Sequence, residues 1–282
     1  MRKRTLVLAV SVLLLSIGGC GALDEQQRRW VFSPSKQSWG GASAEGMQDV
    51  WIAYDSRTAG APIRLHGLWL PQADPKAPVL LYLHGARWDV ASSAGRMRRM
   101  HSLGFAVLGL DYRGFGRSTD VLPSEEGAYE DARAAWDWLA AQHPGVPRYV
   151  FGHSLGGAIA VHLVTDVDAA SGAAGLMLEG AFTSMPALVG TFKWGWLPLG
   201  PLVTQRFDAA GRIGRLQVPV LVVHGSADRL IPPALGRALY ERAPSPKRFV
   251  LVDGGSHHNA GALGLDQTRA AVAELFGIGP VR

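Results

Sequence analysis

The sequence predicts an α/β protein with a mostly parallel central sheet of about eight strands and helices on both faces. Short apolar runs of strand length alternate with helix-like patterns through the later part of the chain, and this alternation is typical of parallel sheets. The first two runs follow each other without a helical pattern between them, so we expect an antiparallel edge there. The runs lie at 49–54, 64–70, 78–83, 105–110, 148–151, 175–178, 218–223 and 248–252.

The first 19 residues have the anatomy of an export signal. The chain begins with MRKR, and the apolar run Thr5 to Ile17 is shorter than the roughly 20 residues that an ordinary transmembrane helix needs. We therefore expect residues 1–19 to be a signal peptide that directs the protein out of the cytoplasm.

The signal ends in IGGC at residues 17–20, which resembles the bacterial lipobox, where the cysteine is acylated and becomes the new N-terminus. Cys20 is the one cysteine of the chain, and lipidation with chains such as palmitate removes an otherwise free thiol from an exported protein. We expect a lipoprotein of the bacterial cell envelope, anchored to a membrane through Cys20. Gly21 in place of aspartate favours the outer membrane. A conventional signal peptide is the alternative.

Residues 20–48 are rich in polar and small side chains, and we expect them to form a tether in which Trp30, Phe32 and Trp39 offer points of packing. Residues 49–282 then form one catalytic domain. The glycine- and proline-broken stretch at about 181–212 interrupts the alternation and predicts a lid.

Charge and composition exclude several classes of function. Three of the 28 basic residues lie in the first four positions, so 25 basic residues face 23 acidic ones in the rest of the chain. No basic cluster is interleaved with aromatic residues, so we expect no nucleic-acid partner. No spacing of His, Cys and carboxylate residues resembles a zinc site, and no complete dinucleotide loop is present. We expect neither a metal nor a cofactor.

The pentapeptide GHSLG at 152–156 lies between the apolar run 148–151 and a helix-like run at 159–164. This is the strand-to-helix setting of a nucleophile elbow. Glycines two residues before and after the serine let the strand and helix approach each other without a clash. The motif predicts Ser154 as a nucleophile.

A serine hydroxyl needs an imidazole to accept its proton, and an acid that holds the imidazole in the right tautomer. Asp228 follows the run 218–223, and His257 follows the run 248–252, in the chain order that this kind of elbow requires. We assign them as acid and base. The alternatives are Glu179 for the acid and His258 for the base, and we assign no chemical role to His84 or His153.

Four motifs resemble those of the α/β-hydrolase superfamily: LHGA at 83–86, DYRGFGRS at 111–118, the serine elbow, and the acid and histidine loops. The resemblance extends from about Asp49 to the C-terminus and is greatest to serine hydrolases with small lids, among them esterases, thioesterases and peptidase-like members. It implies an α/β-hydrolase fold and an oxyanion hole made by the backbone N–H groups of Ala86 and Leu155. Trp88 and Asp89 are then candidates to support that loop.

The lid contains the sequence WGWLPLGP at 194–201. Trp194 and Trp196, with Trp88, could cover apolar core, line an acyl pocket or lie at the headgroup level of a membrane. The pattern as a whole predicts a serine hydrolase that cleaves an ester, thioester or amide of a small-molecule or lipid-like acyl substrate through an acyl-enzyme. An acyltransferase with the same triad and a non-catalytic envelope binding protein are the alternatives.

Overall fold

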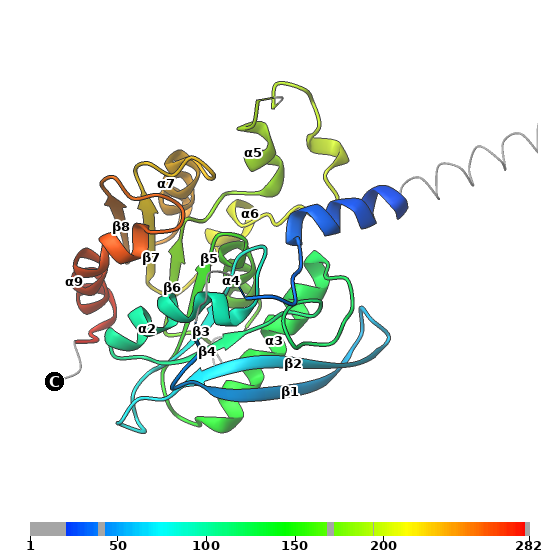
Figure 1. Cartoon of the computed structure of the whole chain (residues 1–282). Coiled ribbons are helices and arrows are strands. Elements are labelled where there is room, and N and C mark those ends of the chain that lie inside the picture. Colours follow the sequence, from blue (N-terminus) through cyan, green and yellow to red (C-terminus); the bar gives the residue numbers. More distant parts are fainter. Residues whose placement is uncertain (1–20, 39–42, 168–171, 194, 280–282) are drawn as a thin grey trace, which may run out of the picture.

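The computed structural model describes residues 21–38, 43–167, 172–193 and 195–279. Its core is an eight-stranded sheet in the order β1-β2-β4-β3-β5-β6-β7-β8, covered by helices (Figure 1). The predicted α/β architecture is confirmed. The strands are β1 Gln48–Ser56, β2 Ala61–Leu70, β3 Val79–Leu83, β4 Ala106–Leu110, β5 Arg148–His153, β6 Gly175–Glu179, β7 Val220–Gly225 and β8 Lys247–Val252.

The antiparallel edge expected from the first two runs is present. β1 pairs antiparallel with β2, and β2 pairs antiparallel with β4. From β4 onward in the sheet order, each pair of neighbouring strands is parallel, through β3, β5, β6 and β7 to β8. Parallel strands end at the same edge of a sheet, so the loops that follow β3, β5, β6, β7 and β8 meet there. This edge is where ligands bind in open α/β sheets.

The two faces of the sheet bury two separate apolar clusters, as the alternation of side chains along a strand requires. In β3, Leu81 and Leu83 belong to the cluster shared with α3 and α4, and Leu80 and Tyr82 belong to the cluster shared with α2 and α9. The helices are α2 Ala94–Ser102, α3 Glu125–Gln142, α4 Leu155–Asp166, α5 Met185–Gly190, α6 Ala210–Ile213, α7 Pro233–Arg242, α8 Ala260–Leu263 and α9 Leu265–Phe276, with 3₁₀ turns at Val90–Ser93 (η1) and Gly200–Leu202 (η2).

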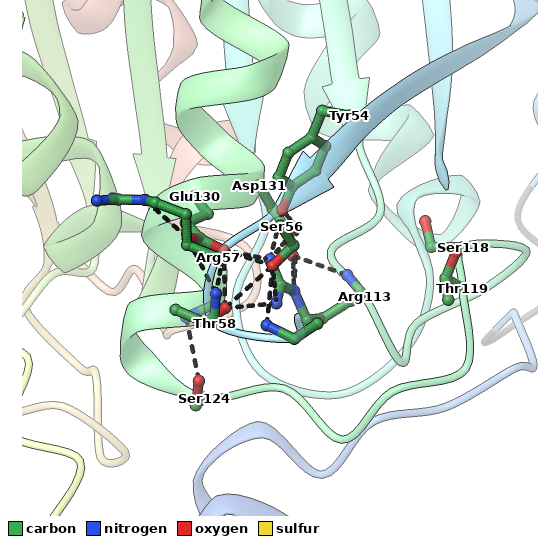
Figure 2. Close-up of polar contacts among 12 residues, drawn as sticks. Tyr54, Ser56, Arg57, Thr58, Arg113, Ser118, Thr119, Ser124, Glu130 and Asp131 are labelled. Atoms are coloured by element: carbon green, nitrogen blue, oxygen red, sulfur yellow. Dashed lines mark hydrogen bonds and ion pairs between the residues drawn. The ribbon is translucent and has the colours of Figure 1, made fainter. Parts of the chain in front are cut away.

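The loop after β4 is fixed by a buried arginine, Arg113, whose side chain is 2% exposed (Figure 2). Its guanidinium bonds Asp131 of α3 at 3.0 Å and Glu130 at 3.2 Å, and it donates to the hydroxyls of Ser56 and Thr58 at 3.1 and 2.8 Å. One side chain thereby ties the loop after β4 to the end of β1 and to α3.

The segment expected to be a tether contains a helix over residues 21–32 that packs on the domain. Phe32 is fully buried, with edge-on ring contacts to Phe115 at 6.4 Å and Phe207 at 5.7 Å. Gln27 donates to the carbonyl of Leu202 in the lid at 2.7 Å, and Figure 1 shows this helix beside the lid. Phe32 is thus one of the points of packing that the sequence offered, whereas Trp30 is exposed, and several polar contacts add to the order of this helix.

Residues 181–212 leave the alternation and carry the short elements α5, η2 and α6 (Figure 1). Trp196 in this lid is 73% exposed. Cys20, Trp39 and Trp194 lie outside the described residues, as does the expected signal peptide at 1–19. In the ranges that the structure describes, no helix combines the length and apolar character needed to cross a membrane.

Candidate functional site

Ser154 occupies the sharp turn between β5 and α4. Its backbone angles are φ 56° and ψ −121°, a region that residues with a Cβ rarely adopt and that is typical of strained functional positions. The surrounding chain holds this turn, because the Ser154 N–H donates to the carbonyl of Glu179 at 2.9 Å and its carbonyl accepts from Gly157 at 2.9 Å. The serine is therefore presented at the carboxyl edge of the sheet.

The two glycines that flank the elbow are needed for close backbone contact. A Cβ on Gly156 would lie 2.1 Å from the carbonyl oxygen of Leu83, and one on Gly152 would lie 2.3 Å from the carbonyl oxygen of Gly156. Any side chain at either position would push α4 away from β3 and β5. The reason proposed from the sequence for these glycines is the one that the packing shows.

Asp228 and His257 form a buried pair. Asp228 Oδ2 lies 2.8 Å from His257 Nδ1, and Asp228 Oδ1 accepts from the backbone N–H groups of Leu230 and Ile231 at 2.9 and 2.8 Å. Burial raises the pKa of Asp228, but hydrogen bonds from His224, His257 and a backbone N–H more than offset it, so the pKa lies below 3.8. An ionised carboxylate only accepts, so Nδ1 carries the proton and Nε2 is the basic nitrogen.

The serine and the histidine flank the same strand end. Ser154 bonds the carbonyl of Glu179, and a Cβ on the next residue, Gly180, would lie 3.2 Å from the His257 ring. The ring of His153, which precedes the serine, lies 4.9 Å from the His257 ring between centroids. The structure thus brings Ser154, Asp228 and His257 into one region at the carboxyl edge.

The two expected oxyanion donors adjoin the elbow. Among the hydrogen bonds between described residues, neither the N–H of Ala86 nor that of Leu155 has an acceptor. Leu155 is in the first turn of α4, where free N–H groups are usual, whereas Ala86 is in a loop. That loop packs on the elbow, because a Cβ on Gly85 would lie 3.0 Å from the Cβ of Ser154.

The loop that carries Ala86 is strained and is held from outside. Arg87 and Trp88 both have left-handed backbones, with φ of 67° and 57°. The N–H of Arg87 donates to the carbonyl of Phe32 at 2.8 Å, and the hydroxyl of Ser38 donates to Asp89. Such conformations persist where neighbouring structure fixes them, and here the N-terminal segment does so.

A residue that sequence reasoning missed, Arg96 of α2, holds the histidine loop. Its Nε bonds Glu179 at 3.0 Å, and its terminal nitrogen donates to the carbonyls of His257 at 3.3 Å and His258 at 3.1 Å. Glu179, the alternative acid, is thus ion-paired with Arg96. In the sequence, Met97 and Met100 are spaced as on the buried side of a helix. This pattern does not show which of the neighbouring arginines also faces the interior.

The other histidines of this edge have different surroundings. Burial lowers the pKa of His153 well below its ordinary value, and its Nε2 lies 3.3 Å from the carbonyl of His257, so the neutral ring donates there. His258 is exposed and touches His257 edge-on at 5.5 Å. His84 is buried, with Nδ1 2.7 Å from the carbonyl of Gly85.

In the described ranges, no three His, Cys or carboxylate side chains are grouped as metal ligands would be.

The sheet order and the serine elbow define an α/β-hydrolase. Residues 73–212 and 202–260 match the family described as serine aminopeptidase S33, and the chain belongs to this family. An uncharacterized protein of Mycobacterium tuberculosis (strain CDC 1551 / Oshkosh) is 33% identical over 285 residues, covering 99% of this chain and 98% of its own length.

Further relatives are lipases and esterases. The lysophosphatidylserine lipase ABHD12 of Danio rerio is 32% identical over 189 residues, and the match covers 60% of this chain but only 48% of the lipase. The Pyrococcus furiosus esterase Pf2001 shares the fold with a TM-score of 0.67 at 17% identity, covering 86% of this chain and 98% of the esterase. The family and the lipase relative support hydrolase activity, and the esterase structure supports the fold.

Proposed function

We propose that this protein is a serine hydrolase that cleaves an ester or thioester of a small or lipid-like acyl substrate through an acyl-enzyme. One observation carries the proposal: the strained Ser154 elbow shares a sheet edge with a buried Asp228–His257 pair whose basic nitrogen is Nε2. This is the arrangement that nucleophilic catalysis by serine requires. The lipase and esterase relatives agree with an acyl substrate.

The geometry gives each residue a step. His257 Nε2 takes the proton of Ser154 as its oxygen attacks the substrate carbonyl, and ionised Asp228 stabilises the imidazolium that forms. The N–H groups of Ala86 and Leu155 then bind the oxyanion, and a donor of this kind contributes about a hundred- to a thousandfold in rate. His257 returns the proton to the leaving group, and water repeats the sequence on the acyl-enzyme.

Labelling with a fluorophosphonate and turnover of a p-nitrophenyl ester series test the proposal together. Ser154→Ala should abolish labelling and lower turnover by several orders of magnitude, because only binding and the oxyanion donors remain. Ser102→Ala, an exposed serine at the end of α2, is the matched control and should keep both activities. Full labelling of the Ser154→Ala variant would contradict the assignment of the nucleophile.

We also propose that the protein is a lipoprotein of the bacterial cell envelope, anchored through Cys20. The basic start, the short apolar run and the IGGC ending support this. Mass spectrometry of the mature N-terminus from a bacterial host should find an acylated Cys20, and Cys20→Ser should lose lipid labelling. An unmodified N-terminus at another residue would contradict the anchor and leave the hydrolase proposal untouched.

A further inference from the structure

Exposed large apolar side chains gather on two segments of the described chain. Of the eleven such residues, seven lie in the helix over 21–32 or in the lid, and we call these seven the lid–helix surface. Single exposed apolar residues are ordinary, but a group of this size on adjoining segments indicates a contact surface. The seven are Leu23, Trp30, Phe192, Trp196, Leu197, Leu199 and Leu202.

The two segments form one surface because polar contacts join them. Gln27 donates to the carbonyl of Leu202 at 2.7 Å and accepts from the N–H of Thr204 at 2.9 Å. Leu23 and Trp30 are seven residues apart, which places them on the same side of a helix, and Gln27 lies between them on that side. The apolar side of the helix therefore borders the lid (Figure 1).

The same surface adjoins the catalytic edge of the sheet. The lid begins directly after Gly180, which faces the His257 ring. At the other end, the helix finishes at Phe32, whose carbonyl holds Arg87 next to Ala86. A partner seated on the lid–helix surface would thus lie beside the edge of the sheet that carries Ser154 and His257.

We propose that the lid–helix surface docks on a lipid bilayer, from which the enzyme takes its acyl substrate. The described part of this helix starts at Gly21, directly after Cys20, the residue proposed to carry the lipid anchor, so an anchored protein would hold this surface close to a bilayer. Tryptophans favour the headgroup level, and Trp30 is 71% exposed and Trp196 73% exposed. The exposed Arg206 adds positive charge that suits phosphate headgroups. The substrate part rests on the proposed function.

The test uses the full chain reconstituted in phosphatidylcholine vesicles and two substrates. p-Nitrophenyl acetate reaches the site from water, and p-nitrophenyl dodecanoate is dissolved in the vesicles. The double variant Trp30→Ser with Leu202→Ser removes two side chains of the surface, and Leu251→Ser with Leu263→Ser removes two exposed apolar side chains elsewhere, on β8 and α8.

Loss of two apolar side chains from the membrane contact should lower the dodecanoate rate by roughly tenfold or more, with the acetate rate unchanged. The control pair should change neither rate. Equal dodecanoate rates in the two double variants would overturn the proposal. If the wild-type protein hydrolysed neither ester, the proposed function would fail, and docking would still be decided by a second measurement.

That measurement is quenching of tryptophan fluorescence by brominated phosphatidylcholine. Trp30→Phe should remove a substantial part of the quenched emission, whereas Trp138→Phe, which alters a half-buried residue of α3, should leave the quenched part unchanged. Equal quenching in the wild-type protein and Trp30→Phe would overturn membrane docking. Cross-linking of two copies through this surface, without quenching by lipid, would assign the surface to self-association and also overturn it.

Discussion

Two buried polar clusters of this protein differ in how completely their hydrogen bonds are used. Around Arg113, every guanidinium nitrogen has an acceptor, supplied by carboxylates and hydroxyls of β1, α3 and the turn after β1 (Figure 2). Around Asp228, the carboxylate is saturated, but among the described residues His257 Nε2 and the N–H of Ala86 have no protein partner. A cluster whose hydrogen bonds are all made fixes the fold, whereas polar groups without a protein partner remain able to bind or react with a substrate.

The largest loss of activity should come from removal of the His257 imidazole, which carries the basic Nε2. His257→Ala should lower turnover about a thousandfold or more, because no other group would take the serine proton. His258→Ala should remain within a few fold, since that side chain is exposed and lacks the contact with Asp228. Steady-state kinetics with one ester measures both variants. If His258→Ala were inactive and His257→Ala active, His258 would be the base.

A change in the cluster around Arg113 should lower the stability of the fold and leave catalysis unchanged. Arg113→Met leaves Asp131 buried without its cation, and we expect a loss of about 3–5 kcal/mol in the free energy of unfolding. Arg133 lies in α3, as Asp131 does, but its ion pair with Asp137 is exposed. Arg133→Met should therefore lower the free energy of unfolding by under about 1 kcal/mol. Urea unfolding measures both. If Arg113→Met lowered turnover per folded molecule as much as His257→Ala does, the Arg113 cluster would have a role in catalysis and the contrast between the two clusters would be wrong.

An intermediate effect should come from Arg96, which touches the reactive cluster only through backbone carbonyls. Arg96→Lys keeps the charge but cannot bond Glu179 and the His257 loop together, so kcat should fall by about tenfold to a hundredfold with KM nearly unchanged. Arg98→Lys, an exposed neighbour on α2, is the control. A change in KM alone would show that Arg96 shapes the binding site and does not position the histidine.

The smallest effect should come from the lowered pKa of Asp228, which adds to the stability of the fold at neutral pH and stops doing so in acid. Because the folded pKa lies below the unfolded value, ionised Asp228 stabilises the fold above about pH 4, and this stability is lost as the pH falls toward the folded pKa. Unfolding free energies of the wild-type protein and Asp228→Asn should therefore converge below about pH 4. A difference between them that is independent of pH would contradict the lowered pKa.

The sequence was informative where one residue type is required by geometry. The glycines at 152 and 156 predicted the elbow because no side chain fits between the elements there, and apolar runs predicted the strands because both faces of the sheet are buried. The antiparallel edge followed from the missing helix between β1 and β2. Each of these features depends on local pattern alone.

The rest depended on contacts between distant segments. In RMRRM at 96–100, each arginine suits an exposed helix, and only the folded chain shows that Arg96 meets Glu179 and the histidine loop. The polar composition of residues 21–32 predicts a tether, and the helix there packs through Phe32 and Val31 and through polar contacts of Arg28 and Gln27 with distant segments. The conformation of the lid could not be predicted either, because glycine and proline indicate where regular secondary structure ends but not how the following residues pack.

The carbonyl of Phe32 that accepts from Arg87 also sets a limit on how the chain can be shortened for laboratory work. A soluble version that began at the first strand, near Gln48, would keep all three proposed triad residues yet lose the support of the strained loop beside Ala86. Such a protein could fold and still turn over slowly, and its low activity would be misread as a poor choice of substrate. The useful starting point lies before Asp24, so that the described helix is kept and only the expected signal peptide and the proposed acylation site are removed.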